Sequence, residues 1–456
     1  MKRKLTIHFK EVPHMAIVLN PKKIRKTFFG LINSMQQHVE DFVNNPGVDF
    51  TRNRLCTFFK TFVTIMSMEC HSLDKEIMGI FTAGEKKYSR KNLVTASAFV
   101  QARGKINDTA FPELFTEFNR SFRFSKTQDG MHMLAVDGSD TNVPADIRDC
   151  NTFIPYNSKN GGYHQMHINC CYDLLEQRYS DVVIQPRAQI NEVSAACEMV
   201  DRKAVSGKCL YISDRGYGSF NYMAHIMEKG DYFLIRWKNI YSRNSPWKNI
   251  IPRGEEEFDL PAKILITRSR KKAKQNPVTY KYIHSIRDFD LIEKGDYTSE
   301  YAIELRLIAI KLDNGTIEYL VTNLPSKIDS SKIKVYYHMR WDIEKSFLFL
   351  KYGISLNYFH SIKRPFLVQE IYAKLILYNY ISLLISCVEL TKKDLKYEYK
   401  VAFKDAIIIG RDFLLGRIKP KDVIPLLKSY ITPIRPDRAY PRKMRSQRLC
   451  AHQHRQ

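Results

Sequence analysis

Two aspartates directly follow short apolar runs that are typical of buried strands. Asp137 follows residues 133–136, and Asp214 follows residues 209–213. Catalytic groups gather at the carboxyl ends of strands in α/β sheets, so we expect both carboxylates at one sheet edge, where hard oxygen ligands bind divalent metal ions. The alternative is that Asp-Gly and Asp-Arg-Gly are ordinary turn sequences in which the aspartate only caps a turn.

A third carboxylate, Glu344, lies in a segment with helical periodicity. Tyr337, Arg340, Glu344 and Lys351 are separated by three, four and seven residues. At ~100° per residue, these four side chains share an arc of about 60° on one helix face. The carboxylate then lies between two cations and a phenol, which suits a phosphodiester bound beside a metal ion. The alternative is an amphipathic helix with an exposed charged face, in which Arg340 and Glu344 form an i,i+4 ion pair.

Other elements must position these motifs. The spacing of apolar residues divides the chain of 456 residues into regions with different secondary-structure patterns. Helical spacing dominates both ends, while short apolar runs separated by turn signals dominate the middle. The pattern predicts an α/β fold with a mixed-sheet core, an inserted mostly-β domain and helical N- and C-terminal regions. The predicted regions are 1–125 (helical), 126–239 (core), 240–328 (β-rich insertion), 329–365 (glutamate helix) and 366–456 (helical, with a basic tail). Long helices are expected near residues 331–352, 366–390, 398–416 and 420–429.

The chain carries a large excess of positive charge. It has 72 Lys and Arg against 48 Asp and Glu, a formal net charge of +24, which normally indicates a polyanionic partner, either nucleic acid or an anionic membrane surface. A membrane span is not expected, because the longest apolar stretch is broken by Asn379, preceded by Lys374 and shorter than the ~20 residues required. The nine cysteines include no CxxC pair, so we expect a reducing cytoplasm rather than disulfides or a zinc ribbon.

Three motifs together carry a resemblance to a known family. They are Asp-Gly-Ser-x4-Pro at residues 137–144, Asp-Arg-Gly-Tyr at 214–217 and Tyr-x2-Arg-x3-Glu-x6-Lys at 337–351. They resemble the signatures of DDE transposases of bacterial insertion sequences, and specifically the insertion-sequence-four family, which includes transposon five. The order of the motifs, the β-rich insertion and the helical ends extend the resemblance over nearly the whole chain.

The resemblance implies an RNase H-like catalytic core in which Asp137, Asp214 and Glu344 bind two Mg²⁺ ions, which Mn²⁺ can replace. The two ions would support in-line phosphoryl transfer, one at the nucleophile and one at the leaving oxygen. The family frees DNA ends by nicking, forming a hairpin and re-opening it, and the 3′-hydroxyls then attack target DNA. The implied partners are double-stranded DNA, as transposon ends and as target, and a second copy of the chain, in the bacterial cytoplasm near the nucleoid.

The resemblance also implies DNA contacts. Tyr337, Arg340 and Lys351 are expected to hold phosphates beside the cleavage site, since cations neutralise backbone charge without reading bases. Arg236 occupies the place of a family arginine on the strand after the second aspartate. Tyr319 stands where the family's best-understood relative stacks a flipped base on a tryptophan, and a tyrosine can also stack a base.

Two alternatives to a transposase stay open. A structure-directed nuclease of the same fold would keep the three acids, and a domesticated DNA-binding protein would bind ends without cutting them. The intact acids and the complete helix signature argue against the second. The basic run at residues 267–275 is either a further DNA contact or a solvated loop.

Overall fold

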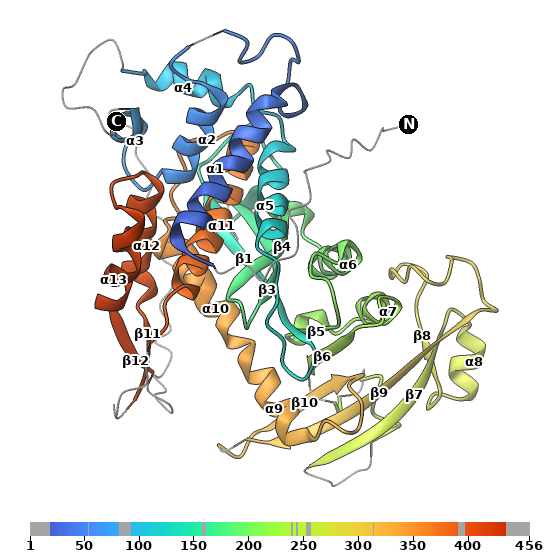
Figure 1. Cartoon of the computed structure of the whole chain (residues 1–456). Coiled ribbons are helices and arrows are strands. Elements are labelled where there is room, and N and C mark those ends of the chain that lie inside the picture. The colour runs from blue at the N-terminus through green and yellow to red at the C-terminus, as the bar shows by residue number, and fades with distance from the viewer. Residues whose placement is uncertain are drawn as a thin grey trace.

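The fold is described from a computed structural model and consists of three layers. A mixed sheet forms the middle layer, helices from both ends of the chain cover one face, and two helices, α6 and α7, cover the other (Figure 1). This arrangement confirms the predicted mixed α/β class. The structure describes residues 19–52, 54–81, 93–156, 161–238, 240–242, 245–251, 257–312, 314–390 and 397–434.

The sheet is built around β1 and has an RNase H-like centre. β1 lies antiparallel to β3 on one side and parallel to β5 on the other, and β5 lies parallel to β6. β4 also pairs with β3, so three antiparallel strands are followed by two parallel ones. The strands are β1 (His132–Val143), β2 (Phe153–Pro155), β3 (Gly162–Asp173), β4 (Arg178–Pro186), β5 (Cys209–Ser213), β6 (Tyr232–Trp237), β7 (Phe258–Thr267), β8 (Tyr280–Tyr282), β9 (Glu300–Lys311) and β10 (Ile317–Thr322).

The β-rich insertion continues the core sheet. β10 pairs antiparallel with β6 and with β9, and β7 and β8 follow at the far edge, where the strands curve away from the helices (Figure 1). The pairing with β10 leaves no exposed edge on β6, which would otherwise be open to other strands. The basic run at 267–275 largely forms the short helix α8 (Arg270–Gln275) beside β8.

The helices predicted at both ends are present, with two corrections. The helix expected near residues 331–352 is divided at Arg340 into α9 and α10 and ends in a wide turn over residues 349–353. Residues 398–401 were expected to begin a helix, but they form β11, which pairs with β12, so the helix begins at Phe403. Partial burial alternates with exposure along these four residues, which is the two-residue period of a strand. The helices are α1 (Pro21–Gln37), α2 (Phe58–Ser67), α3 (Leu73–Phe81), α4 (Ala96–Arg103), α5 (Ala110–Ser121), α6 (Glu192–Arg202), α7 (Phe220–Glu228), α9 (Ser330–Met339), α10 (Trp341–Leu348), α11 (Arg364–Ser386), α12 (Phe403–Leu414) and α13 (Pro420–Ser429); β11 is Glu398–Val401 and β12 is Ile431–Ile434.

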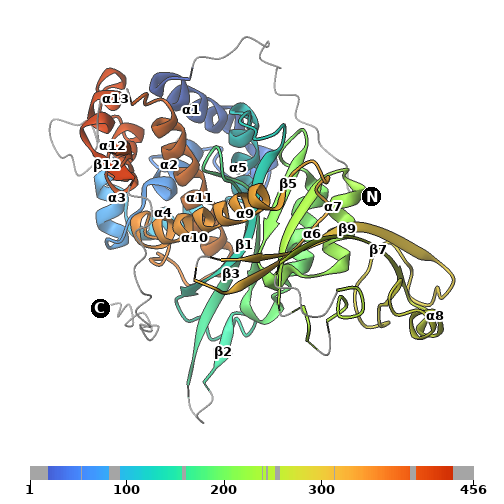
Figure 2. The ribbon, with the colours of Figure 1, turned by 90° about the horizontal axis from the view of Figure 1, so that it is seen from below.

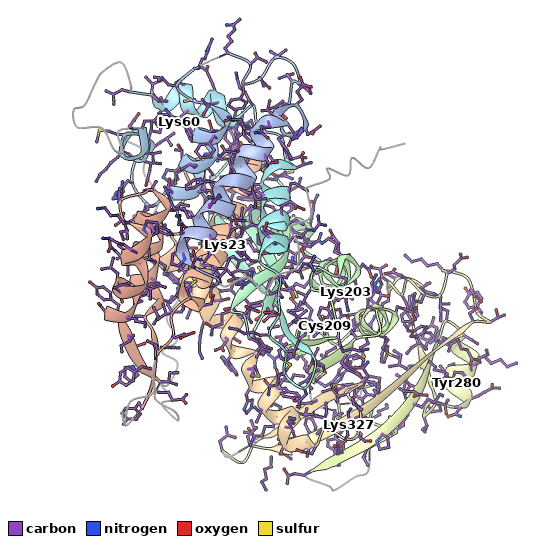
Figure 3. All side chains as sticks on the ribbon, in the orientation of Figure 1. Lys23, Lys60, Lys203, Cys209, Tyr280 and Lys327 are labelled. Carbon is purple, nitrogen blue, oxygen red and sulfur yellow. The ribbon has the colours of Figure 1, made fainter. Side chains whose placement is uncertain are left out.

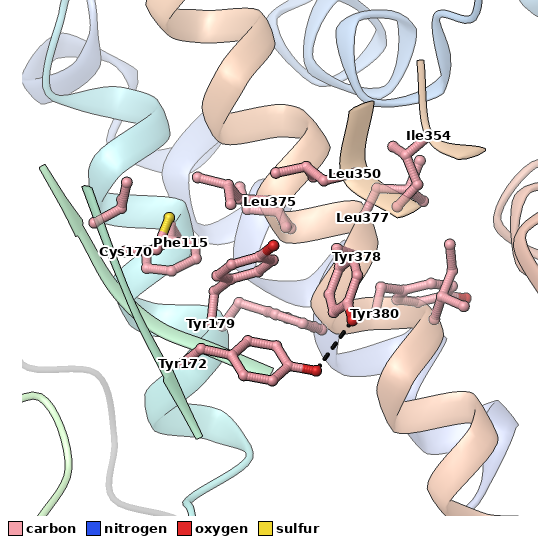
Figure 4. Packing of buried hydrophobic residues seen from close by; sticks show 14 of the residues in the cluster. Phe115, Cys170, Tyr172, Tyr179, Leu350, Ile354, Leu375, Leu377, Tyr378 and Tyr380 are labelled. Carbon is pink, nitrogen blue, oxygen red and sulfur yellow. Dashed lines mark hydrogen bonds between the residues drawn. The ribbon is translucent and has the colours of Figure 1, made fainter. Parts of the chain in front are cut away.

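The two helical ends share one hydrophobic core. α11 packs against α1, α2, α5 and α12, and its inner face contacts β4. Three tyrosines lie between this helix and the sheet (Figure 4). The hydroxyls of Tyr172 and Tyr378 lie 3.1 Å apart, and that of Tyr179 lies 2.8 Å from Ser346 Oγ on α10. The domain boundaries stay predictions, but the first and last regions pack as one layer.

The two polar residues that interrupt the apolar stretch of α11 are buried and have backbone partners. Lys374 Nζ donates to the carbonyl of Met68. Asn379 Oδ1 accepts from the N–H of Tyr179 at 2.8 Å, and its Nδ2 donates to the Tyr179 carbonyl at 2.7 Å and to Asn119 Oδ1 at 2.9 Å. Within the described part of the chain, no helix is long and apolar enough to cross a membrane.

We predict that Asn379→Leu lowers the free energy of unfolding by about 2–4 kcal/mol, because the buried Tyr179 N–H and Asn119 Oδ1 lose their hydrogen bonds to Asn379. Urea unfolding followed by circular dichroism measures the change. Ser382→Ala is the matched control on the same helix, since the buried Ser382 hydroxyl has no hydrogen-bond partner among the described residues. Equal losses in the two variants would contradict the assigned role of Asn379.

Candidate active site

β1 and β5 place the two aspartates side by side. Their parallel register ends with Val136 opposite Ser213, so Asp137 and Asp214 are the next residues on strands spaced ~4.8 Å apart. Asp214 ends its strand, and its Oδ1 accepts from the N–H of Gly216 at 2.7 Å. The expectation that Asp137 also ends its strand is wrong, because β1 continues to Val143 through pairing with β3.

Arg340 connects the first aspartate to the glutamate. α9 and α10 run almost end to end across the sheet (Figure 2), and Arg340 lies at their junction. Its Nη1 donates to Asp137 Oδ2 at 3.1 Å, and its Nη2 donates to Glu344 Oε1 at 2.9 Å. The Arg340 side chain is only 8% exposed. The i,i+4 pair expected on an amphipathic helix is therefore present, but it faces the sheet rather than solvent.

The three carboxylates act on one another electrostatically. Burial raises the pKa of Asp137, Arg340 and the Gly138 N–H lower it, and the nearby Asp214 and Glu344 carboxylates raise it again, to about 6. A raised pKa means that the ionised form of Asp137 is costly in this environment. Within this centre, one guanidinium bonds to two of the three carboxylates.

The donor set of this centre fits a divalent cation. Carboxylate oxygens are the hard ligands that such ions prefer, and the excess negative charge is what a dication would neutralise. Arg340 supplies positive charge between Asp137 and Glu344. With these side-chain positions, no three His, Cys, Asp or Glu side chains in the described ranges lie close enough together to hold a metal ion. Binding an ion therefore requires the carboxylates to turn toward a common point.

Two of the predicted DNA contacts lie beside this centre. The guanidinium carbon of Arg340 lies 5.9 Å from the centre of the Tyr337 ring. Burial raises the pKa of Tyr337, while Arg340 and Arg236 lower it, which places Arg236 near the same phenol. Arg236 Nε also lies 3.4 Å from Glu318 Oε1 on β10. The structure therefore brings Tyr337, Arg340 and Arg236 together.

Lys351 lies on the other side of the centre. It belongs to η5 (Phe349–Gly353), a wide turn in which the N–H of Ile354 bonds to the carbonyl of Phe349, so the α-helical spacing used for its expected direction does not extend through this turn. Burial lowers the pKa of Lys351, and the Asp140 carboxylate opposes that shift. Lys351 is therefore close to Asp140, three residues after the first aspartate.

Tyr319 does not join the other predicted contacts. In the β10–β6 register, Tyr319 is opposite Trp237 and Leu320 is opposite Arg236. Directly paired residues share a sheet face and neighbours alternate, so Tyr319 and Arg236 point to opposite faces. Its ring centre lies 6.1 Å from that of Tyr241 in an edge-on arrangement. Base stacking by Tyr319 stays a prediction.

Sequence reasoning missed a histidine and a glutamate that lie beside the aspartates. His167 Nδ1 lies 2.7 Å from Asp140 Oδ1, and its Nε2 lies 3.1 Å from Glu192 Oε1. Burial favours the neutral ring, but Asp140 and Glu192 outweigh it and raise the pKa of His167 to about 9. Glu192 follows the helix cap Asn191, so the sequence indicated only a helix start, and His167 lies inside an apolar strand.

We predict that Asp137→Asn stabilises the metal-free protein in a pH-dependent way. The pKa of an unfolded aspartate is ~3.9, and that of Asp137 in the fold is about 6. A raised pKa of an acid means that its contribution to stability is present below pH ~4 and lost as pH rises through 6. The substitution should therefore gain about 1–3 kcal/mol at pH 8 relative to pH 4.

Urea unfolding with a chelator present, repeated from pH 4 to pH 8, checks this prediction. Asp342→Asn is the control, because Asp342 is a more exposed acid on α10, the helix that carries Glu344, and it pairs with Lys345 at 2.9 Å. Parallel pH profiles for Asp137→Asn and the wild type would show that Asp137 is not destabilised by its surroundings.

Comparison with known proteins identifies the family of the chain. Residues 129–380, more than half of the chain, match the family model described as the transposase DDE domain. No curated protein matches the sequence. Among solved structures, the chain is similar to a piggyBac transposase in a synaptic complex with hairpin DNA, at 11% identity over 91% of this chain and 82% of that chain, with a TM-score of 0.46. The matched segment contains both aspartates and the glutamate helix, and the chain belongs to the transposase DDE domain family.

Proposed function

We propose that this DDE transposase binds the terminal inverted repeats of an insertion sequence of the insertion-sequence-four family, cleaves them and joins their 3′-hydroxyls to target DNA. The observation that carries the proposal is that Asp137 and Asp214 follow paired positions of two parallel strands, while Arg340 bonds to both Asp137 and Glu344. The hairpin route rests on the resemblance of the three sequence motifs to that family.

The three carboxylates are proposed to hold Mg²⁺, as DDE transposases generally use divalent metal ions. Two bound ions would supply activation of the nucleophile and stabilisation of the leaving oxygen. The chain itself positions the DNA. The Arg236 and Arg340 guanidiniums, which both act on the Tyr337 phenol, are proposed to contact phosphate oxygens together with the Tyr337 hydroxyl.

Double-stranded DNA is the proposed partner, bound by two copies of the chain in the synaptic complex. The net charge of +24 supports a polyanion. Basic side chains occur on the helices of both faces and on the turn between β10 and α9, as the labelled Lys23, Lys60, Lys203 and Lys327 show (Figure 3). We place this activity in the cytoplasm, at the nucleoid. The basic tail from residue 435 lies outside the described residues.

The test is incubation of purified protein with a labelled end fragment and Mg²⁺, followed by a denaturing gel. We predict nicks and hairpins with the wild type, and a loss of at least about 10³-fold for Asp137→Asn, Asp214→Asn and Glu344→Gln, because the acids act as one unit. End binding in a gel-shift assay should remain. Glu304→Gln is the control, since Glu304 is an exposed acid paired with Lys263 on the β-rich segment. Wild-type cleavage by any variant of the three acids would refute the site.

The same assay separates a transposase from a nuclease of the same fold. A fragment with scrambled inverted repeats should be left intact by a transposase, whereas a structure-directed nuclease would cut both fragments alike. Strand transfer of the cleaved ends into a supercoiled plasmid, visible as a change in plasmid mobility, is expected only of the transposase.

A further inference from the structure

The ring of His167 lies against the backbone of Gly138, the residue that follows the first aspartate. A Cβ atom at position 138 would lie 2.3 Å from His167 Nε2, closer than any real contact of this kind. The N–H of Gly138 donates to Asp137 Oδ1 at 2.9 Å. His167 therefore limits where the peptide that orients the Asp137 carboxylate can lie.

Glu192 contacts both His167 and Gly216, the glycine that follows the second aspartate by two residues. Its Oε1 pairs with His167 Nε2 at 3.1 Å, and its Oε2 would lie 3.7 Å from a Cβ atom on Gly216. The N–H of Gly216 donates to Asp214 Oδ1 at 2.7 Å. Each motif glycine thus orients the carboxylate of a neighbouring aspartate, and the His167–Glu192 pair lies against both glycines.

Asp140 and the start of α6 hold the His167–Glu192 pair in place. His167 Nδ1 lies 2.7 Å from Asp140 Oδ1, which fixes the rotation of the ring, and the His167 side chain is 5% exposed. Glu192 is the first residue of α6, where the positive end of the helix dipole favours a carboxylate. The Tyr217 side chain is buried, and this burial raises its pKa. The Asp137 and Glu192 carboxylates raise the pKa further, so both carboxylates lie near the Tyr217 phenol.

We propose that His167 and Glu192 are positioning residues that hold the Asp137 and Asp214 turns at the spacing needed to bind a divalent cation. The inference rests on the proposed function, because it assumes that the two aspartates bind metal. Outer residues that support metal ligands typically change metal affinity by 10–100-fold when they are replaced; His167 and Glu192 would do so through Gly138 and Gly216, whose N–H groups bond to the aspartates. A purely structural histidine would affect folding without affecting metal affinity.

The test measures Mn²⁺ binding to the purified, DNA-free, full-length protein by electron paramagnetic resonance, with Mg²⁺ as competitor. His167→Gln and Glu192→Gln are each expected to raise the dissociation constant for Mn²⁺ by about 10-fold. In the nicking assay, the Mg²⁺ concentration for half-maximal rate should rise similarly, while the rate at saturating Mg²⁺ changes little. Glu192→Gln carries the test if His167→Gln does not fold.

His225 provides a matched control. Its Nδ1 lies 3.0 Å from Asp201 and its Nε2 lies 2.9 Å from Asp290, so it is another histidine between two carboxylates. Asp201 is nine residues after Glu192 on α6, about 13 Å along the helix axis, and thus well separated from the Asp214 turn. His225→Gln should leave the affinity for Mn²⁺ unchanged.

Three results would overturn the inference. The first is Mn²⁺ affinity within about twofold of the wild type for both His167→Gln and Glu192→Gln. The second is an equal loss for His225→Gln, which would indicate general destabilisation. The third is complete loss of binding for Glu192→Gln with normal binding for His167→Gln, which would make Glu192 a direct ligand. If the wild type binds no Mn²⁺, or Asp137→Asn binds it normally, the proposed metal site itself is wrong.

Discussion

The repulsion among three carboxylates in one half-buried site is the constraint on which the rest of this structure depends. Asp137, Asp214 and Glu344 come from two strands and a helix that are far apart in the sequence. Like charges at short range in a protein interior cost several kcal/mol unless a cation balances them. Arg340 balances part of this charge by bonding to Asp137 and Glu344. The remaining repulsion must be opposed by the packing of the surrounding elements.

Buried polar contacts fix the geometry of that packing. Ser346, two residues after Glu344, is held by the Tyr179 hydroxyl, and the backbone of Tyr179 is held by Asn379. The glutamate helix is thereby connected through β4 to α11, the most buried helix of the molecule's helical layer. Apolar contacts alone would let a helix slide, whereas hydrogen bonds to buried partners fix its register because each broken bond is costly.

Local patterns were sufficient to predict many elements from the sequence. β5 has the predicted bounds, because a continuous apolar run between turn residues marks a buried strand. The extension of β1 beyond Asp137 was missed, since residues 138–143 are polar and are held in the strand only by pairing with β3. The continuation of the sheet through β10 was missed for the same reason, as strand pairing between distant segments leaves no local signal.

Some features of the candidate site could likewise be predicted from local sequence, and others depend on contacts between distant segments. The spacing of Arg340 and Glu344 on one helix face was readable, because four residues return a helix to the same side. The contact of Arg340 with Asp137 was not, because it joins residues 203 positions apart. His167 and Glu192 carry no motif of their own, and their meaning appears only when the fold brings them against Gly138 and Gly216.

The repulsion among the three carboxylates also explains why basic side chains lie beside them. A net charge of +24 attracts DNA, but attraction alone brings any phosphate to any basic surface. A phosphodiester approaching three carboxylates is repelled unless cations lie between them. Arg236 and Arg340 lie on the Tyr337 side of the centre, and Lys351 lies on the Asp140 side. Arg340 bonds to two of the acids, while Arg236 and Lys351 interact with Tyr337 and Asp140, so cations lie beside the acids, where a phosphate would otherwise be repelled.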